Sequence, residues 1–200
     1  ILSHAHIDHS GNIPNLVKNG FRGDIITTSA TRDLCSVMLR DSAKIQESDV
    51  AYLNKRRLRE EQPPLEPLYT MADALASLKQ FVGINYERPY QVAPGLTLTL
   101  YDAGHVLGSA LVVLDVADDD HGRPARVVFT GDLGRAKRPI LNDPVFLERA
   151  DVLIMESTYG DREHPNDVDT DHLLEDIIRD TIKQGGKVIV PAFAVGRTQE

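Results

Sequence analysis

Residues 4–11 read HAHIDHSG and place three histidines and one aspartate within six positions. Side chains two residues apart in an extended segment point to the same side, so His4 and His6 can reach one metal ion together. Asp8 and His9 follow where the chain turns into a predicted helix, which can aim them at a second ion. Imidazole suits zinc, and a carboxylate helps to hold a second cation. A histidine-rich loop or tag remnant is the alternative, but the alternation with apolar residues favours a metal site.

Two later turns flanked by glycines supply further candidate ligands. His105 lies in AGHVLGSA and Asp132 in FTGDLGR, each after a predicted strand. Glycine on both sides lets the backbone approach a crowded centre closely. Two ions about 3.5–4 Å apart can share a hydroxide and clamp an in-line displacement. His121, His164 and His172 lack the flanking pattern of a ligand and are not assigned.

Composition places the chain among folded proteins of moderate size. Its 200 residues are 42% hydrophobic and 26% charged, which favours a real core over disorder. The single cysteine, Cys35, excludes an internal disulfide framework and favours a reducing, cytoplasmic compartment. No apolar run approaches the roughly 18 residues of a membrane span, so no membrane partner is expected. The net charge of −8 argues against a simple basic nucleic-acid-binding domain, but bound cations invert the local field.

Hydrophobic periodicity predicts strands mixed with covering helices, an α/β fold built in layers. In the predicted helix over residues 31–46, Leu34, Val37 and Met38 are expected on one face. Thr70 is the predicted N-cap of the helix that follows it in the chain. The later strands are apolar enough to be buried on both faces. Helices are predicted over residues 10–20, 31–46, 70–82 and 171–186, with a partly helical excursion over 47–68. Strands are predicted to end at residue 6 and to cover 24–29, 90–103, 110–117, 125–132, 150–158 and 187–195.

Five motifs in this order resemble the metallo-β-lactamase superfamily: HAHIDHSG, AGHVLGSA, FTGDLGR, ESTYGDREH and PAFAVGRTQE. The first motif alone would indicate only the superfamily. The last two narrow the resemblance to its β-CASP branch of RNA- and DNA-processing nucleases, near the cleavage-and-polyadenylation endonuclease and its prokaryotic relatives. The resemblance extends over nearly the whole chain.

The resemblance implies a four-layered αββα sandwich with zinc at one edge. Residues 1–160 would form this metallo-β-lactamase domain, incomplete because its first strands and their aspartate motif would precede Ile1. Residues 161–200 would form the truncated start of a β-CASP domain. Two further histidine motifs of the family would follow Glu200, one of them completing the second zinc site, so the chain is expected to be a fragment that alone binds metal poorly.

The resemblance also implies a ligand set for two zinc ions. Carried over by motif, His4, His6 and His105 would hold one ion, Asp8 and His9 the other, and Asp132 would bridge them. Asp8 and Glu156, the latter in MESTYG, are the catalytic candidates, with Glu156 expected near the leaving-group side; a plain strand-end carboxylate is the alternative for it.

Substrate contacts are expected from the start of the predicted β-CASP domain and from basic clusters. Gly196, Arg197 and Thr198 could present backbone N–H groups and a guanidinium to a phosphate at a helix N-terminus, although a simple helix start explains them equally. The clusters KRRLR (55–59) and GRAKR (134–138) could follow a nucleic-acid backbone. For the first, a solvated helix face is the simpler explanation.

The function implied is a zinc-dependent RNA-processing nuclease that hydrolyses phosphodiester bonds with a metal-bridged hydroxide, in endonuclease or 5′-exonuclease mode. Single-stranded RNA is the expected partner, DNA is the alternative substrate, and a homodimer is left open. Two other functions remain: a small-molecule hydrolase of the same superfamily acting on a thioester, lactone or β-lactam, and a non-catalytic scaffold subunit of a processing complex.

Overall fold

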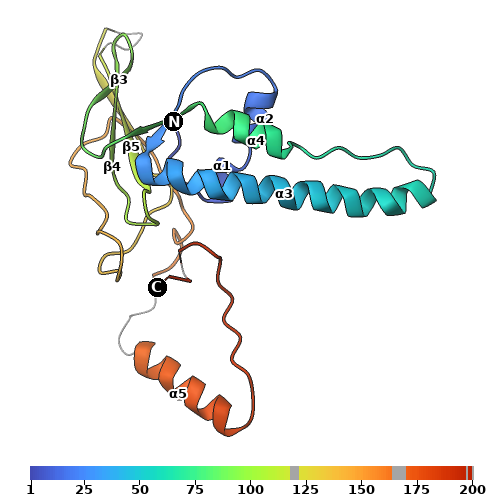
Figure 1. Cartoon of the computed structure of the whole chain (residues 1–200). Helices are drawn as coiled ribbons and strands as arrows, with labels where there is room; N and C mark the ends of the chain where they lie inside the picture. Colours follow the sequence, from blue (N-terminus) through green and yellow to red (C-terminus); the bar gives the residue numbers. More distant parts are fainter. Residues whose placement is uncertain (118–121, 164–169, 197, 200) are drawn as a thin grey trace. The chain divides into compact units, whose positions relative to one another are not determined.

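The computed structural model describes residues 1–117, 122–163, 170–196 and 198–199, and it shows a mixed α/β chain (Figure 1). The chain separates into two compact units, Ile1–Glu156 and Ser157–Glu200. The described helices of the first unit are α1 (Ile7–Ser10), α2 (Ile13–Lys18), α3 (Ser29–Arg59) and α4 (Met71–Leu78). Its described strands are β1 (Ile25–Thr28), β2 (Phe81–Ile84), β3 (Tyr90–Ala93), β4 (Leu96–Asp102), β5 (Ala110–Val116), β6 (Ala125–Phe129) and β7 (Val152–Ile154). The predicted α/β class is therefore confirmed.

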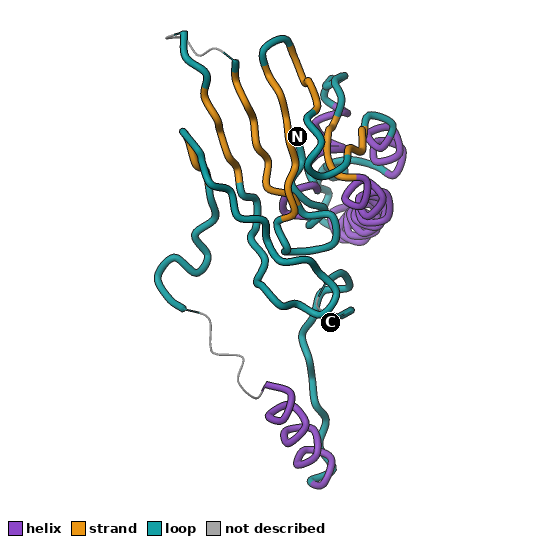
Figure 2. The backbone as a smooth tube through the Cα atoms, turned by 90° about the vertical axis from the view of Figure 1, so that its left-hand side faces the viewer, coloured by secondary structure: helices purple, strands orange, loops and turns teal. Residues whose placement is uncertain are grey.

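The strands of the first unit form two sheets. β1 and β2 pair in parallel, and the larger sheet has the order β3-β4-β5-β6-β7. Its pairs are antiparallel except for the last, in which β6 and β7 run in parallel. Figure 2 shows the strands of the larger sheet side by side, with the helices of this unit gathered to one side of it. The turns after β4 and β6 leave the sheet at the same end, because both strands run antiparallel to β5 between them.

Helix α3 extends the predicted helix through most of the charged excursion and is 31 residues long. Residues four apart lie on one face of a helix, and one such row is buried: Thr31, Cys35, Leu39 and Ala43. Leu34 and Met38 pack against this core, as expected. The prediction for Val37 was wrong, because this side chain is 64% exposed. It lies two positions from Cys35 and Leu39, about 200° round the helix from each.

Helix α4 begins with a reciprocal cap that the sequence predicted in part. The Thr70 hydroxyl oxygen accepts a hydrogen bond from the Asp73 N–H at 3.3 Å. The Asp73 carboxylate accepts one from the Thr70 N–H at 2.8 Å. This capping box satisfies two N–H groups at the start of the helix, so the prediction that Thr70 is an N-cap is confirmed.

Two apolar clusters hold the first unit together and fix the N-terminal segment between the sheets. One cluster joins the helices to β1 and β2, and the other joins Ile26 to side chains of β4 and β5. The Leu2 N–H donates to the Ile26 carbonyl at 2.9 Å, and the Ala110 N–H donates to the Ser3 carbonyl at 2.9 Å. Residues 1–6 therefore link the two sheets through hydrogen bonds without forming a strand, so the predicted strand end there was wrong.

Two predictions about the later strands were also wrong. In β7, Val152, Leu153 and Ile154 are 48%, 54% and 52% exposed rather than buried on both faces. Among the described residues, β7 is the last strand of its sheet and pairs only with β6, so one edge and much of its surface stay open. Residues 187–195 form no strand.

The second unit contains helix α5 (Thr170–Lys183), which confirms the helix predicted there. The helix ends before Gly185, whose φ of +69° suits a helix stop. Arg179 pairs with Asp176 and Glu175 on the preceding turn. Over the part of the chain that the structure describes, no helix is long and apolar enough to cross a membrane.

Candidate metal centre

His4 is the buried centre of the histidine cluster. Its Nδ1 lies 3.1 Å from the Ser3 hydroxyl, which leaves Nε2 as the free ring nitrogen. This Nε2 is buried and has no hydrogen-bond partner among the described residues, and it lies 3.7 Å from Asp132 Oδ2. Burial, followed by the repulsion of neighbouring imidazoles, lowers the pKa of His4 to about 3. The ring is therefore neutral near pH 7, which is the form that binds a metal.

Three more side chains converge on the same point. His105 Nε2 lies 3.1 Å from His6 Nδ1 and 3.5 Å from Asp132 Oδ2. One ligand atom each from His4, His6, His105 and Asp132 all lie within 4.8 Å of one another. Burial, chiefly, lowers the pKa of His105, with the His6 ring adding to the effect. The sheets thus bring His105 and Asp132 to the opening cluster, as the sequence predicted.

His9 and Asp8 sit on the first turn of α1 and differ in how they approach this cluster. His9 Nε2 lies 3.2 Å from Asp132 Oδ1, the carboxylate oxygen opposite to the one that faces His4 and His105. The Asp8 side chain is 74% exposed, and its Oδ2 lies 3.6 Å from His9 Nε2. Among the described residues, this is its contact with the cluster. His9 therefore belongs to the cluster, while Asp8 marks its solvent-facing margin.

The turn that carries His105 is held by Ser109, which sequence reasoning missed. The Ser109 hydroxyl accepts hydrogen bonds from the N–H groups of His105 and Val106 at 3.0 and 3.2 Å. Gly108 has a φ of +86°, and its carbonyl accepts bonds from the hydroxyls of Thr28 and Thr31. The start of α3 is therefore tied to this turn. The serine after the glycine in AGHVLGSA was the available signal.

The turn that carries Asp132 packs directly on the His105 turn and on the N-terminal segment. Gly131, with a φ of +54°, approaches so closely that a Cβ there would lie 2.8 Å from the Ser3 side chain. A Cβ on Gly134 would lie 1.7 Å from the Gly104 carbonyl oxygen. The Gly134 N–H also donates to the Ala103 carbonyl at 2.8 Å. The glycines thus permit the backbone contact that was expected of them.

Glu156 follows β7 and braces the Asp132 turn. One of its carboxylate oxygens accepts a hydrogen bond from the Leu133 N–H, directly after Asp132. Its own N–H donates to the Thr130 hydroxyl at 3.3 Å. The Glu156 charge is close enough to His105 to raise the pKa of that ring, against the larger effect of burial. Glu156 therefore lies against the Asp132 turn, and its catalytic role stays a prediction.

Proteins of similar sequence align with this chain from end to end. A transcription termination factor, FttA, from Pyrococcus abyssi is 37% identical over 205 residues. Ribonuclease TTHA0252 from Thermus thermophilus and the endoribonuclease ysh1 of Schizosaccharomyces pombe are each 34% identical, over 200 and 202 residues. All three alignments include 100% of this chain, which spans 29%, 41% and 24% of the respective relatives. No protein-family model matches the chain.

End-to-end similarity to these three proteins, on a chain whose motif ligands meet in space, decides the family. The chain belongs to the β-CASP branch of the metallo-β-lactamase superfamily. The resemblance drawn from the five motifs is therefore confirmed.

The substrate residues expected from the β-CASP resemblance lie in the second unit. The Gly196 N–H donates to the Gln199 side chain at 2.7 Å, and the Thr198 hydroxyl donates to the Phe193 carbonyl. Arg197 lies outside the described residues. No helix begins among the described residues of 192–199, so the expected helix N-terminus is not seen. Its phosphate-binding role stays a prediction.

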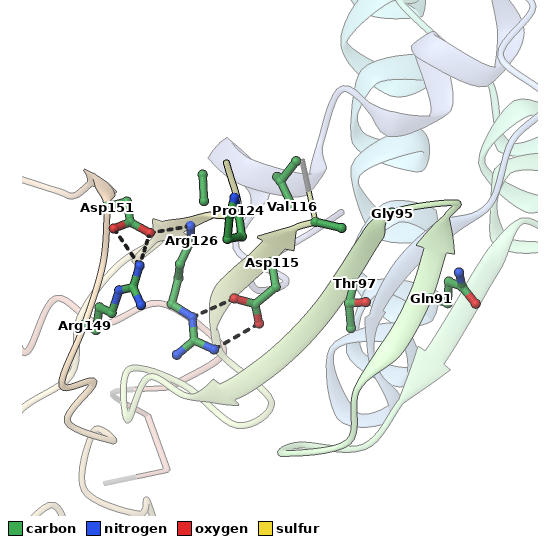
Figure 3. A pocket seen from close by; sticks show the side chains of 11 residues that line it. Gln91, Gly95, Thr97, Asp115, Val116, Pro124, Arg126, Arg149 and Asp151 are labelled. Atoms are coloured by element: carbon green, nitrogen blue, oxygen red, sulfur yellow. Dashed lines mark hydrogen bonds and ion pairs between the residues drawn. The ribbon is translucent and has the colours of Figure 1, made fainter. Parts of the chain in front are cut away.

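The β-CASP chain also has a hollow at the opposite end of the larger sheet (Figure 3). This hollow does not add to the metal centre. It lies where β4 and β6 begin, away from the turns that carry His105 and Asp132. Arg126 donates to the Asp115 carboxylate at 2.7 and 3.0 Å, and Arg149 pairs with Asp151 at 3.0 Å. Each arginine is neutralised by a carboxylate, so the hollow does not favour a phosphate group.

Proposed function

We propose that the protein is a zinc-dependent RNA-processing nuclease that hydrolyses phosphodiester bonds at the His4–Asp132 cluster. The observation that carries this proposal is the buried Nε2 of His4, which has no partner among the described residues and faces three other metal-binding side chains. A buried polar atom without a partner costs free energy, and a metal ion bound there would remove that cost. Relatives named as a ribonuclease and an endoribonuclease support the reaction.

The donor set would serve one zinc ion and part of the ligand shell of a second. His4, His6 and His105 would hold one, and His9 and Asp8 would hold the other. The two oxygens of Asp132 support its role as a bridge, because Oδ2 faces His4 and His105 while Oδ1 faces His9. Bound zinc supplies a water molecule of lowered pKa and positive charge for the phosphate oxygens.

The residues of the chain hold and orient this centre. Ser3 engages Nδ1 of His4 and thereby directs Nε2 into the cluster. Burial lowers the pKa of His4 and of His105, so that one ring nitrogen of each carries no proton near pH 7 and is open to a metal ion. Glu156 fixes the backbone beside Asp132, and we propose that its carboxylate lies on the leaving-group side of the substrate.

The finer fold follows from the same proposal. The two sheets, with the helices gathered on the side of the smaller one, support the part of a metallo-β-lactamase αββα sandwich that residues 1–160 would form. We assign residues 161–200 to the start of a β-CASP domain. The substrate is single-stranded RNA rather than DNA, in keeping with the names of the relatives. A cytoplasmic location rests on the single free thiol of Cys35.

Zinc content and RNA cleavage by the complete gene product test the proposal. We expect Asp132→Ala to abolish cleavage and to lower bound zinc, because it removes the carboxylate shared by both ligand groups. Asp24→Ala, which removes an exposed carboxylate ahead of β1, is the matched control and should change neither. Cleavage of a chromogenic ester instead of RNA, or full cellular function in Asp132→Ala, would contradict the proposal in favour of a small-molecule hydrolase or a scaffold.

A further inference from the structure

We propose that the segment Arg135–Arg138, called here the basic loop, binds phosphates of the RNA strand beside the metal centre. The inference rests on the proposed nuclease function and adds a substrate subsite to it. The loop carries three positive side chains in four positions, Arg135, Lys137 and Arg138. The chain as a whole has a net charge of −8, so the loop is a locally positive segment of an acidic chain.

The basic loop is fixed next to the metal ligands. It begins immediately after Gly134, whose N–H donates to the Ala103 carbonyl at 2.8 Å. The same glycine packs on Gly104 so closely that no Cβ would fit between them. Arg135 is three residues from Asp132, so their Cα atoms are at most about 11 Å apart. The first positive side chain thus starts within reach of a phosphate that neighbours the cleaved one.

The far side of the loop is anchored to the same place. The Lys137 N–H donates to the Asp143 carboxylate at 2.6 Å, in a turn where Lys137 has a φ of +64°. The Asn142 side chain donates to the Asp102 carboxylate at 3.0 Å, and the Val145 N–H donates to the Asp102 carbonyl at 2.9 Å. Asp102 ends β4, three residues before His105. The chain on both sides of the loop is therefore bonded to Asp102 and Ala103, which lead into the His105 turn.

Exposure and charge suit a phosphate contact. Lys137 is exposed, and Arg135 and Arg138 are half-buried, which leaves part of each side chain in solvent. In the contact between Asp143 and Lys137, the carboxylate engages the backbone N–H of Lys137 rather than its ammonium group. Basic side chains that neutralise phosphates release counterions, so binding through them weakens as salt rises.

The second basic cluster of the chain, KRRLR, differs from the basic loop in its distance from the metal centre. The cluster occupies the last turns of α3, and its first residue, Lys55, is about 36 Å along the helix from Thr31. Thr31 is where α3 contacts the His105 turn. This cluster has similar charge and lies far from the centre, so it provides a matched control.

The test compares two triple variants of the complete gene product, Arg135→Gln/Lys137→Gln/Arg138→Gln and Lys55→Gln/Arg57→Gln/Arg59→Gln. Equilibrium binding of a fluorescent single-stranded RNA is measured over a series of salt concentrations, with bound zinc determined for each protein. For the loop variant we expect about tenfold weaker binding at moderate salt, and a logarithmic salt slope smaller by about 2, at roughly 0.7 for each lost contact. The α3 variant should keep the slope of the unchanged protein.

An unchanged slope in the loop variant, or equal losses in both variants, would overturn the proposal. If the triple change lowers bound zinc, the single variant Lys137→Gln replaces it in the test. The proposal then requires a logarithmic salt slope of RNA binding that is smaller by about 0.7, and an unchanged slope would overturn it. Absence of RNA cleavage by the unchanged protein counts against the proposed function only. The difference in slope between the two variants still decides whether the loop binds the strand.

Discussion

Single polar side chains set the chemistry of the centre, and several of them act through backbone groups. Ser3 turns the His4 ring, Ser109 shapes the His105 turn, and Glu156 holds the N–H of Leu133. Such supporting bonds orient metal ligands and fix which ring nitrogen is available. The position of Asp132 therefore depends on a carboxylate that is 24 residues further along the chain.

Replacing Glu156 tests this support. Glu156→Ala would leave the Leu133 N–H without its acceptor, so we expect the free energy of unfolding to fall by about 1–3 kcal/mol and bound zinc to fall with it. Glu156→Gln keeps an acceptor oxygen and should retain most of both. Denaturant unfolding and metal analysis measure the two effects. Equal losses in the two variants would show that the charge, and not the hydrogen bond, holds the turn.

The turns after β4 and β6 act as one structural element. Each ends a strand of the larger sheet, and the antiparallel register with β5 brings them to the same end. Their contact is made of backbone atoms at Gly104 and Gly134. A short contact of this kind transmits any displacement of one turn to the other, because no flexible side chain lies between them.

We expect Gly134→Ala to separate the two turns, since its Cβ would lie 1.7 Å from the Gly104 carbonyl oxygen. Overpacking of this kind typically costs about 1–3 kcal/mol, and moving Asp132 from His105 should lower zinc affinity more than stability. Ala136→Ser, at an exposed position of the same loop, is the control. Zinc titration and thermal unfolding measure both quantities. Zinc affinity equal to that of the unchanged protein would contradict the proposed packing.

At the level of the whole unit, the larger sheet is covered unevenly. Its centre packs against the N-terminal segment and the smaller sheet, while β7 leaves three consecutive apolar side chains about half exposed. Among the described residues, the outer edge of β7 has no strand beside it. Apolar edge strands of this kind favour pairing with another chain.

We therefore expect the 200-residue chain to self-associate as its concentration rises. Leu153→Lys places a charge on the exposed strand and should shift the chain toward monomer, because a charged edge resists strand pairing. Val37→Lys makes the same change at an exposed apolar position on α3 and should not. Sedimentation velocity over a concentration series distinguishes them. A monomeric unchanged chain at all concentrations would refute the expectation.

The amino-acid sequence alone indicated the candidate ligands and most of the elements. Alternation and helical spacing are local properties, so β4, β5, α4 and α5 were predicted, and so was the Thr70 cap. The glycine-flanked turns singled out His105 and Asp132 because a crowded centre needs close backbone approach. Residues 187–195 show the limit of such patterns, because apolar character permits a strand but a strand also needs a partner.

The assembled sheets decided which of these groups meet. His6 and His105 are 99 residues apart, and only the strand register places their ring nitrogens 3.1 Å from each other. The bond from Ser3 to the His4 ring, and the exposure of Val37 and β7, were equally absent from any local pattern. Burial depends on what packs against a residue, and that is a property of the folded molecule as a whole.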